Sequence, residues 1–255
     1  MFSKSCDMLR GKDVRRLRMR KRHNLEPRME RCKDYLVTDP AARKGTWRQP
    51  GTGLWLEIGC GKGSFTCAVA EAKPDCSLVA IEKVPDAMIL AMERASRAGL
   101  KNVCFLDYDA AGLREIFEPG ELDGIYINFC DPWPKSRDAK FRLTAPAFLR
   151  IYADLLPVGG EIRFKTDNGP LFEWSVEQFL QEGWTLRELT RDLHAGGVTG
   201  ILTDYERRFL GEGVPIKRLV AVRGENTLDH RAGEPPRLRN AALADARANQ
   251  KEKQE

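Results

Sequence analysis

The sequence predicts an α/β fold, built on a mostly parallel seven-stranded sheet with helices on both faces. Between residue 54 and about residue 223, short apolar runs of strand length alternate with amphipathic stretches of helical period. Glycines and prolines fall between these runs, where the chain must turn. With 255 residues and 42% hydrophobic content, the chain can bury a substantial core.

The expected elements follow in order. The first strand covers residues 54–58 and leads through a glycine loop into a helix that Pro74 stops. The second strand, residues 77–82, precedes a helix with Pro85 in its first turn and Gly99 just past its end. Further strands are expected at residues 102–106, 122–129, 161–166, 184–190 and 215–222, with helices around residues 148–156 and 172–180.

Positive charge is concentrated at the amino terminus. The formal net charge is +5, yet residues 1–31 hold 11 lysines and arginines against 4 acids, most densely at residues 15–22. Such a run suits the phosphate backbone of a nucleic acid, and the alternative is a solvated leader with no partner. We expect a basic N-terminal extension at residues 1–50, a main domain at residues 51–223 and a polar C-terminal tail at residues 224–255.

Several classes of protein are disfavoured. No stretch approaches 18 consecutive apolar residues and no secretory signal is recognisable, so a cytoplasmic protein without a membrane span is expected. The seven cysteines form no CxxC pair, and with three scattered histidines they show no zinc-ligand spacing. We therefore expect reduced cysteines and no bound metal.

The strongest local signal is the glycine loop after the first strand. Gly59, Gly61 and Gly63 follow Glu57, and glycines at this position let backbone approach a ligand. The third glycine comes one residue too early for the GxGxxG pattern of a dinucleotide site, because position 64 is serine. An acid before such a loop better fits a ligand that brings an adenosine and a charged amino acid without a pyrophosphate, such as S-adenosylmethionine.

Two acids at the ends of the next strands extend this pattern. Glu82 ends the second strand and is placed to bind ribose hydroxyls, while Asp109, beyond the third strand, could accept from an adenine amino group. Each acid alone is an ordinary surface residue, and a glycine loop alone is often a tight turn. On consecutive strand ends, the three features together favour a nucleoside cofactor.

A stiff loop follows the fourth strand. In Asp131-Pro132-Trp133-Pro134, two prolines flank a tryptophan and hold the carboxylate and the indole in a fixed orientation. An aromatic face can stack on an extruded base while a carboxylate accepts from its Watson-Crick edge. The alternative is a rigid structural turn with a core tryptophan. Positive charge for phosphates follows at Lys135, Arg137, Lys140 and Arg142.

Six separated motifs of the chain occur together in one known family. They are EIGCGKG (57–63), IEK (81–83), NFCDPWPK (128–135), KTDN (165–168), TDYE (203–206) and GVPI (213–216). From about Arg18 to Val222, this combination resembles the bacterial tRNA (guanine-N7-)-methyltransferases. The resemblance implies a class I S-adenosylmethionine-dependent methyltransferase with a Rossmann-like fold, which methylates N7 of a guanine in the variable loop of tRNA.

The resemblance also implies roles for individual residues. It makes Asp131 the catalytic residue, and it makes cofactor contacts of Glu57, Glu82, Asp109 and Asp131. Substrate-binding positions are Lys135, Asp167, Thr203, Asp204, Tyr205 and Glu206. The chain departs from the family pattern after the aspartate loop. Cys130 replaces a usual serine, and Ser136, Asp138 and Phe141 interrupt a usually more basic run, which leaves the register of the RNA contacts open.

Guanine N7 carries a free lone pair, so its attack on a sulfonium methyl group requires no base. What an enzyme must supply is alignment, which fits a chain with few histidines. Two other readings remain: an amino-group nucleobase methyltransferase with a similar Asp-Pro-Pro-aromatic loop, and a noncatalytic RNA-binding protein with a methyltransferase fold. An NAD-linked dehydrogenase ranks third. The choice of tRNA, the oligomeric state (monomer or homodimer) and the role of the tail are left open.

Overall fold

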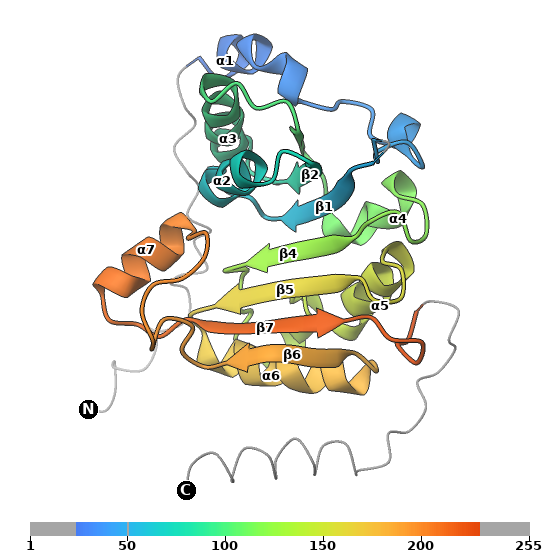
Figure 1. The fold of residues 1–255 in the computed structure, drawn as a ribbon, viewed down its shortest axis with the longest axis vertical. Coiled ribbons are helices and arrows are strands. Elements are labelled where there is room, and N and C mark those ends of the chain that lie inside the picture. The colour runs from blue at the N-terminus through green and yellow to red at the C-terminus, as the bar shows by residue number, and fades with distance from the viewer. Residues whose placement is uncertain (1–23, 50, 230–255) are drawn as a thin grey trace, which may run out of the picture.

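The computed structural model describes residues 24–49 and 51–229 and shows one seven-stranded sheet in the order β3-β2-β1-β4-β5-β7-β6 (Figure 1). Strands β1 to β5 pair in parallel with one another, and β7 runs antiparallel between β5 and β6. The strands are β1 (Gly53–Ile58), β2 (Cys76–Ile81), β3 (Val103–Leu106), β4 (Gly124–Asn128), β5 (Glu161–Thr166), β6 (Thr185–Thr190) and β7 (Lys217–Val222). The predicted α/β class and the seven strands are confirmed.

Helices cover both faces because successive strand side chains point to opposite sides. Leu78 and Ala80 belong to the core beneath α2 and α3, whereas Val79 and Ile81 belong to the core on the other face, with α4, α5 and α6. The helices are α2 (Ser64–Ala72), α3 (Pro85–Arg97), α4 (Leu113–Ile116), α5 (Pro146–Leu155) and α6 (Gly169–Gln181). Short 3-10 turns lie at Lys33–Tyr35, Ala41–Arg43, Ala110–Gly112 and Ser136–Phe141.

Part of the expected N-terminal extension packs on the domain. Helix α1 (Leu25–Arg31) lies on α3, where Arg28 makes two hydrogen bonds of 2.6 Å with the Glu93 carboxylate. Trp47 is 3% exposed, belongs to the main core and donates from Nε1 to the Ile116 carbonyl. Residue 50 therefore does not separate an independent extension from the domain, because a core side chain lies on its N-terminal side.

The C-terminal boundary also differs from the expected one. Thr227 and Leu228 are buried, and the Thr227 hydroxyl donates to the Gly183 carbonyl. The packed chain thus continues past residue 224. The basic run at residues 15–22 and the tail from residue 230 lie outside the described residues. Among those described, no helix has the length and apolar character that crossing a membrane requires.

The sheet order reverses between β1 and β4, and such a point is where open α/β sheets bind ligands, at the carboxyl ends of the strands. The edge formed by these strand ends is flanked by a helix that the sequence reasoning did not predict, α7 (Asp204–Gly211) (Figure 1). It begins with a capping box, in which the Thr203 hydroxyl accepts from the Glu206 N–H and the Glu206 carboxylate accepts from the Thr203 N–H.

Candidate functional site

The glycine loop between β1 and α2 has an open side and a closed side. Gly59, Gly61 and Gly63 have φ angles of 77°, 56° and 72°, a region that favours glycine. A Cβ at Gly59 or Gly61 would meet nothing within 4 Å, whereas one at Gly63 would lie 2.4 Å from Cβ of Ala91. The first two glycines therefore leave a free surface at the strand ends, and the third lets α3 pack against the loop.

The Glu82 carboxylate is held beside this loop by backbone donors. Its Oε2 accepts from the Gly61 N–H and its Oε1 accepts from the Val84 N–H, each over 2.9 Å. Each oxygen keeps a second lone pair. The structure thus brings Glu82 to the glycine loop as expected, in a fixed orientation, and its contact with a ribose stays a prediction.

Glu57 lies beneath the loop and is 2% exposed. The Thr66 hydroxyl donates to its Oε2 over 2.5 Å, and the Asn128 side-chain amide donates to its Oε1 over 3.2 Å. Burial raises the pKa of Glu57 to about 7, and the two hydrogen bonds oppose that rise. Glu57 therefore links β1 with α2 and β4, two contacts that sequence reasoning did not identify, and its contact with a cofactor stays a prediction.

Asp109 lies past the end of β3 and is half exposed. Its Oδ1 accepts from the Ala111 N–H over 3.0 Å, and its Oδ2 pairs with the Lys83 ammonium. The Ala111 N–H, followed by Lys83, holds the pKa of Asp109 below its usual range. Because Lys83 directly follows Glu82, both expected acids lie close together at this edge, while the adenine contact of Asp109 stays a prediction.

The aspartate loop after β4 lies at the same edge and is strained. Phe129 and Trp133 have φ angles of 52° and 42°, which are costly for residues other than glycine. The Arg142 guanidinium donates to the carbonyls of Pro132 (3.0 Å) and Trp133 (2.9 Å), which adds to the stiffness given by the prolines. Asp131 is exposed, and no hydrogen bond or ion pair reaches its carboxylate from the described residues. The loop therefore holds a carboxylate open to a ligand.

Beside Asp131, two aromatic groups extend the surface. The Trp133 ring packs at 5.4 Å from the ring of Phe141, which is 50% exposed. On the other side, Phe129 stacks on Tyr205 and Phe209 of α7, each at 5.9 Å between ring centroids. Helix α7 thus packs directly against the start of the aspartate loop.

The six expected substrate-binding residues differ in their exposure to solvent. Lys135, Asp204 and Tyr205 are exposed, and Tyr205 is 58% exposed. Asp167 is half-buried at the end of β5 and its backbone carbonyl accepts from Lys217. Thr203 and Glu206 are buried and hydrogen bond within the protein. Substrate binding by all six stays a prediction, and for Thr203 and Glu206 the side chains face inward.

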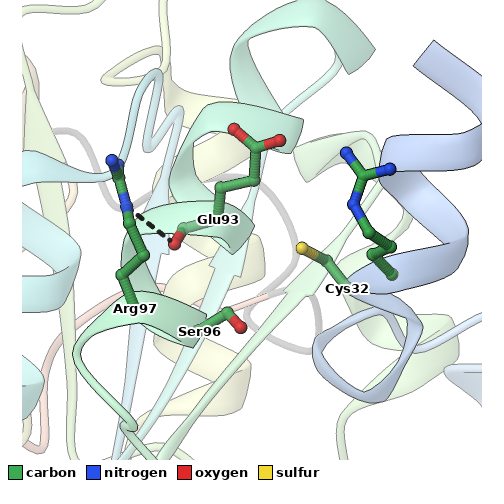
Figure 2. A pocket seen from close by; sticks show the side chains of 5 residues that line it. Cys32, Glu93, Ser96 and Arg97 are labelled. Atoms are coloured by element: carbon green, nitrogen blue, oxygen red, sulfur yellow. Dashed lines mark hydrogen bonds between the residues drawn. The ribbon is translucent and has the colours of Figure 1, made fainter. Parts of the chain in front are cut away.

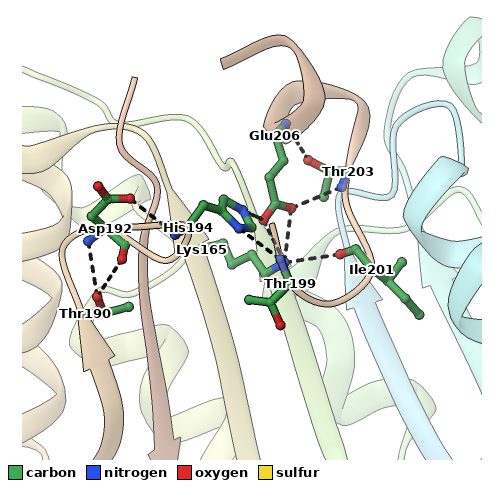
Figure 3. Close-up of polar contacts among 8 residues, drawn as sticks. All are labelled: Lys165, Thr190, Asp192, His194, Thr199, Ile201, Thr203 and Glu206. Carbon is green, nitrogen blue, oxygen red and sulfur yellow. Dashed lines mark hydrogen bonds and ion pairs between the residues drawn. The ribbon is translucent and has the colours of Figure 1, made fainter. Parts of the chain in front are cut away.

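The inward-facing pair belongs to a buried polar cluster (Figure 3). The Glu206 carboxylate accepts from the Lys165 ammonium at 3.1 Å to each oxygen, and His194 Nε2 lies 2.8 Å from its Oε1. Burial lowers the pKa of Lys165, and the Glu206 charge opposes this. The sequence offered one signal for this arrangement, the Thr203-x-x-Glu206 spacing of a capping box, whereas nothing in it pointed to His194.

A surface cleft between α1 and α3 lies apart from these residues (Figure 2). It is lined by the last two turns of α3, which run away from the strand ends, and by Arg31 and Cys32. Burial raises the pKa of the Cys32 thiol, which leaves less thiolate for chemistry. The cleft therefore is not part of the candidate site. Within residues 24–49 and 51–229, no three histidine, cysteine, aspartate or glutamate side chains gather as metal ligands, and the described cysteines are unpaired.

Comparison with known proteins places this chain in a family. A family model described as "Putative methyltransferase" matches residues 52–219. A tRNA (guanine-N(7)-)-methyltransferase of Lachnoclostridium phytofermentans is 43% identical over 195 residues, which cover 74% of this chain and 91% of the relative. The enzymes of the same name from Listeria monocytogenes and Streptococcus agalactiae are 41% and 39% identical, over 80% of this chain and at least 98% of each relative.

Solved structures agree with the fold. The 16S rRNA methyltransferase KamB is 18% identical, covers 78% of this chain and 94% of its own, and aligns with a TM-score of 0.53. An antibiotic-related methyltransferase, also 18% identical, covers 72% and 90% with a TM-score of 0.50. At this level of identity, the likeness supports the class I methyltransferase fold.

Proposed function

Because the chain belongs to the family of tRNA (guanine-N7-)-methyltransferases, we propose that it transfers a methyl group from S-adenosylmethionine to N7 of a guanine in the variable loop of tRNA. The observation that carries the site assignment is the exposed carboxylate of Asp131, which has no hydrogen bond or ion pair from the residues that the structure describes, on a strained loop at the same sheet edge as the open glycine loop. S-adenosylmethionine supplies a methyl group on a positively charged sulfur. Because its proposed substrate is tRNA, we also propose that the protein acts in the cytoplasm.

The glycine loop fits a nucleoside donor that lacks a pyrophosphate. The N–H groups of Gly59 and Cys60 donate to the Ile81 carbonyl, that of Gly61 to Glu82, and that of Gly63 to the Cys60 carbonyl. A phosphate-binding loop needs such N–H groups to point at its ligand. Since these donors are used within the protein, the loop offers space rather than an anion cradle, and this weighs against the dehydrogenase reading.

On the donor side, the residues present can hold the nucleoside part of the cofactor. The fixed Glu82 carboxylate offers two acceptors for ribose hydroxyls, and the free surface above Gly59 and Gly61 offers room for the remainder of the molecule. Asp109 stands on the next strand end, where an adenine amino group can reach it. Glu57, beneath the loop, joins β1 to α2 and β4 through two hydrogen bonds and has lone pairs left for the amino-acid portion.

On the acceptor side, Asp131 orients the guanine. Its carboxylate accepts from the N1 and N2 hydrogens, which become more acidic as the ring gains positive charge at N7, so these hydrogen bonds strengthen toward the transition state. No base is required, because N7 already carries its lone pair. The chain's contribution is therefore alignment, which positioning by a stiff loop provides.

The surroundings of this loop support RNA binding. Guanine N7 in an A-form helix lies in a groove too deep and narrow for side chains, so the target must be a loop base or an extruded one. Trp133 and Phe141 offer an aromatic face for such a base. Exposed Lys135, Arg137 and Lys140, on and next to the 3-10 turn that follows, supply positive charge for the adjoining phosphates.

The deciding experiment incubates the full chain with bulk tRNA and S-adenosylmethionine that carries a labelled methyl group, then identifies the labelled nucleoside. Label in 7-methylguanosine is expected. Label in N6-methyladenosine would instead support an amino-group methyltransferase, and the absence of label, with tRNA still bound, would support a noncatalytic RNA-binding protein. The Asp131→Ala variant serves as the control for contaminating activity.

A further inference from the structure

We propose that His194 is a positioning residue for tRNA binding: it holds α7 against the aspartate loop through Glu206 and does not itself touch the substrate. This inference rests on the proposed function and adds a residue to it. His194 lies in the segment between β6 and α7, and its side chain is 4% exposed. This buried histidine lies beside the first turn of α7, the helix that carries Asp204 and Tyr205. It can therefore influence the position of these two residues without contacting the substrate.

The contacts of His194 indicate which ring nitrogen carries the proton in the neutral ring. The Thr199 backbone N–H donates to Nδ1 over 3.4 Å, so this nitrogen acts as an acceptor. In the neutral ring the proton is then on Nε2, which lies 2.8 Å from Oε1 of Glu206 and donates to it. One side chain thus connects the segment before α7 with the first turn of α7 (Figure 3).

Glu206 gathers the remaining contacts. Its side chain is fully buried and takes hydrogen bonds from His194, from Lys165 of β5 and from the Thr203 N–H. The Lys165 ammonium also donates to the Ile201 carbonyl and lies 5.6 Å from the centre of the Phe65 ring on α2. The cluster therefore fixes α7 to the sheet and to the helix that follows the glycine loop.

The position of α7 matters for tRNA binding because the helix carries two exposed residues that are expected to bind the substrate. Tyr205 stacks on Phe129, which begins the aspartate loop, and it remains largely exposed to a ligand. Asp204 is exposed next to it. If Glu206 lost one of its donors, a buried carboxylate would be under-satisfied and the first turn of α7 would be less firmly placed. We expect the effect on tRNA binding, while the donor side and the carboxylate of Asp131 stay as they are.

Two substitutions separate the two hydrogen bonds of the ring. In glutamine, the amide nitrogen lies the same number of bonds from the backbone as Nε2, so His194→Gln can still donate to Glu206. In asparagine, the amide reaches the position of Nδ1, so His194→Asn can still accept from Thr199 but cannot reach Glu206. Ser175→Ala is the matched control, because it removes a buried hydroxyl that bonds to Thr144 and Leu171 away from the site.

The readouts are KM for tRNA, kcat, donor affinity by calorimetry, and amide hydrogen exchange of residues 204–211. For His194→Asn we expect KM for tRNA to rise about ten-fold, the scale of one hydrogen bond to a charged acceptor, with kcat and donor affinity within about two-fold. Exchange in α7 should accelerate. His194→Gln should stay within about two-fold of the unmodified protein, and Ser175→Ala should lower stability without changing KM.

Several results would overturn the inference. These are an unchanged KM in His194→Asn, equal impairment of the glutamine and asparagine variants, or a KM rise in Ser175→Ala of the same size. The exchange measurement is independent of catalysis. If the protein transferred no methyl group to tRNA, the proposed function would fail, yet unchanged exchange of α7 in His194→Asn would still be what refutes the role of His194.

Discussion

The two sides of the candidate site are built in different ways. The donor side is made by backbone: left-handed glycines, N–H groups that donate to the loop and to the end of β2, and a Glu82 carboxylate that accepts from the N–H groups of Gly61 and Val84. The acceptor side is made by side chains from β4, β5, the segment after β6, and α7, joined by stacked rings and a buried ion pair. The donor side thus depends on backbone contacts between the ends of neighbouring parallel strands, whereas the acceptor side depends on side chains from segments far apart in the sequence.

The largest expected effect is on the acceptor side. Asp131→Asn replaces one acceptor oxygen with a donor, so a hydrogen bond that strengthens in the transition state is lost. We expect kcat to fall about 100- to 1,000-fold, the scale seen when one electrostatic contact to developing charge is removed. Steady-state kinetics on tRNA measures this, with calorimetry for donor affinity. Wild-type turnover in this variant would remove Asp131 from the mechanism.

The next effect tests the buried acid of the donor side. The pKa of Glu57 is raised to about 7, so its protonated form stabilises the fold below about pH 4.5, and this contribution is lost as the pH rises through about 7. Relative to Glu57→Gln, the free energy of unfolding of the natural protein should fall by about 3 kcal/mol between about pH 4.5 and about pH 8.

Urea unfolding at several pH values measures this difference. Glu71→Gln, which changes an exposed glutamate of α2, is the control and should show no such trend. A constant difference between Glu57→Gln and the natural protein across this range would mean that burial does not govern the ionisation of Glu57.

A smaller effect separates two glycines of one loop. Gly63→Ala and Gly61→Ala both place a side chain at positive φ, but at Gly63 the new Cβ would meet Ala91 at 2.4 Å and at Gly61 it meets nothing within 4 Å. We expect Gly63→Ala to be less stable than Gly61→Ala by about 2 kcal/mol, because overpacking adds to the shared backbone strain. Thermal and urea unfolding would show it, and equal stabilities would contradict the close packing of α3 on the loop.

The smallest expected effect concerns phosphate binding. Lys135→Ala should weaken tRNA binding and reduce the slope of log affinity against log salt concentration by about 0.7, the value for one contact with a single-stranded backbone. Lys101→Ala is the control, because Lys101 is exposed and lies just before β3, at the amino ends of the parallel strands. An unchanged slope for Lys135→Ala would mean that Lys135 is a solvated surface residue that does not contact a phosphate.

The sequence allowed most of the fold to be predicted, because strand and helix patterns are local. Pro85 begins α3, Gly99 follows its end with a φ of 63°, and the predicted strands agree with the observed ones within a few residues. The proximity of Glu82 to the glycine loop could also be predicted. Strand ends of a parallel sheet meet at one edge, so Glu82 meets the glycine loop.

The acceptor side could be predicted less well. Its aspartate loop was recognised from two prolines, but the stacking of Phe129 on α7 and the burial of His194 depend on tertiary packing that no local pattern records. Trp47 shows the same limit in the fold: a basic, polar surrounding sequence concealed a core residue. Helix α7 itself was missed although its capping box is readable, since its short apolar pattern gives little helical period.

The inward-directed N–H groups of the glycine loop have one consequence for the order of events. A loop in which the N–H groups of Gly59, Cys60, Gly61 and Gly63 already have acceptors is preorganised, and a molecule that enters it has little chain to immobilise. The methyl donor can therefore bind before RNA does, and the enzyme can bind each tRNA with the donor already in place.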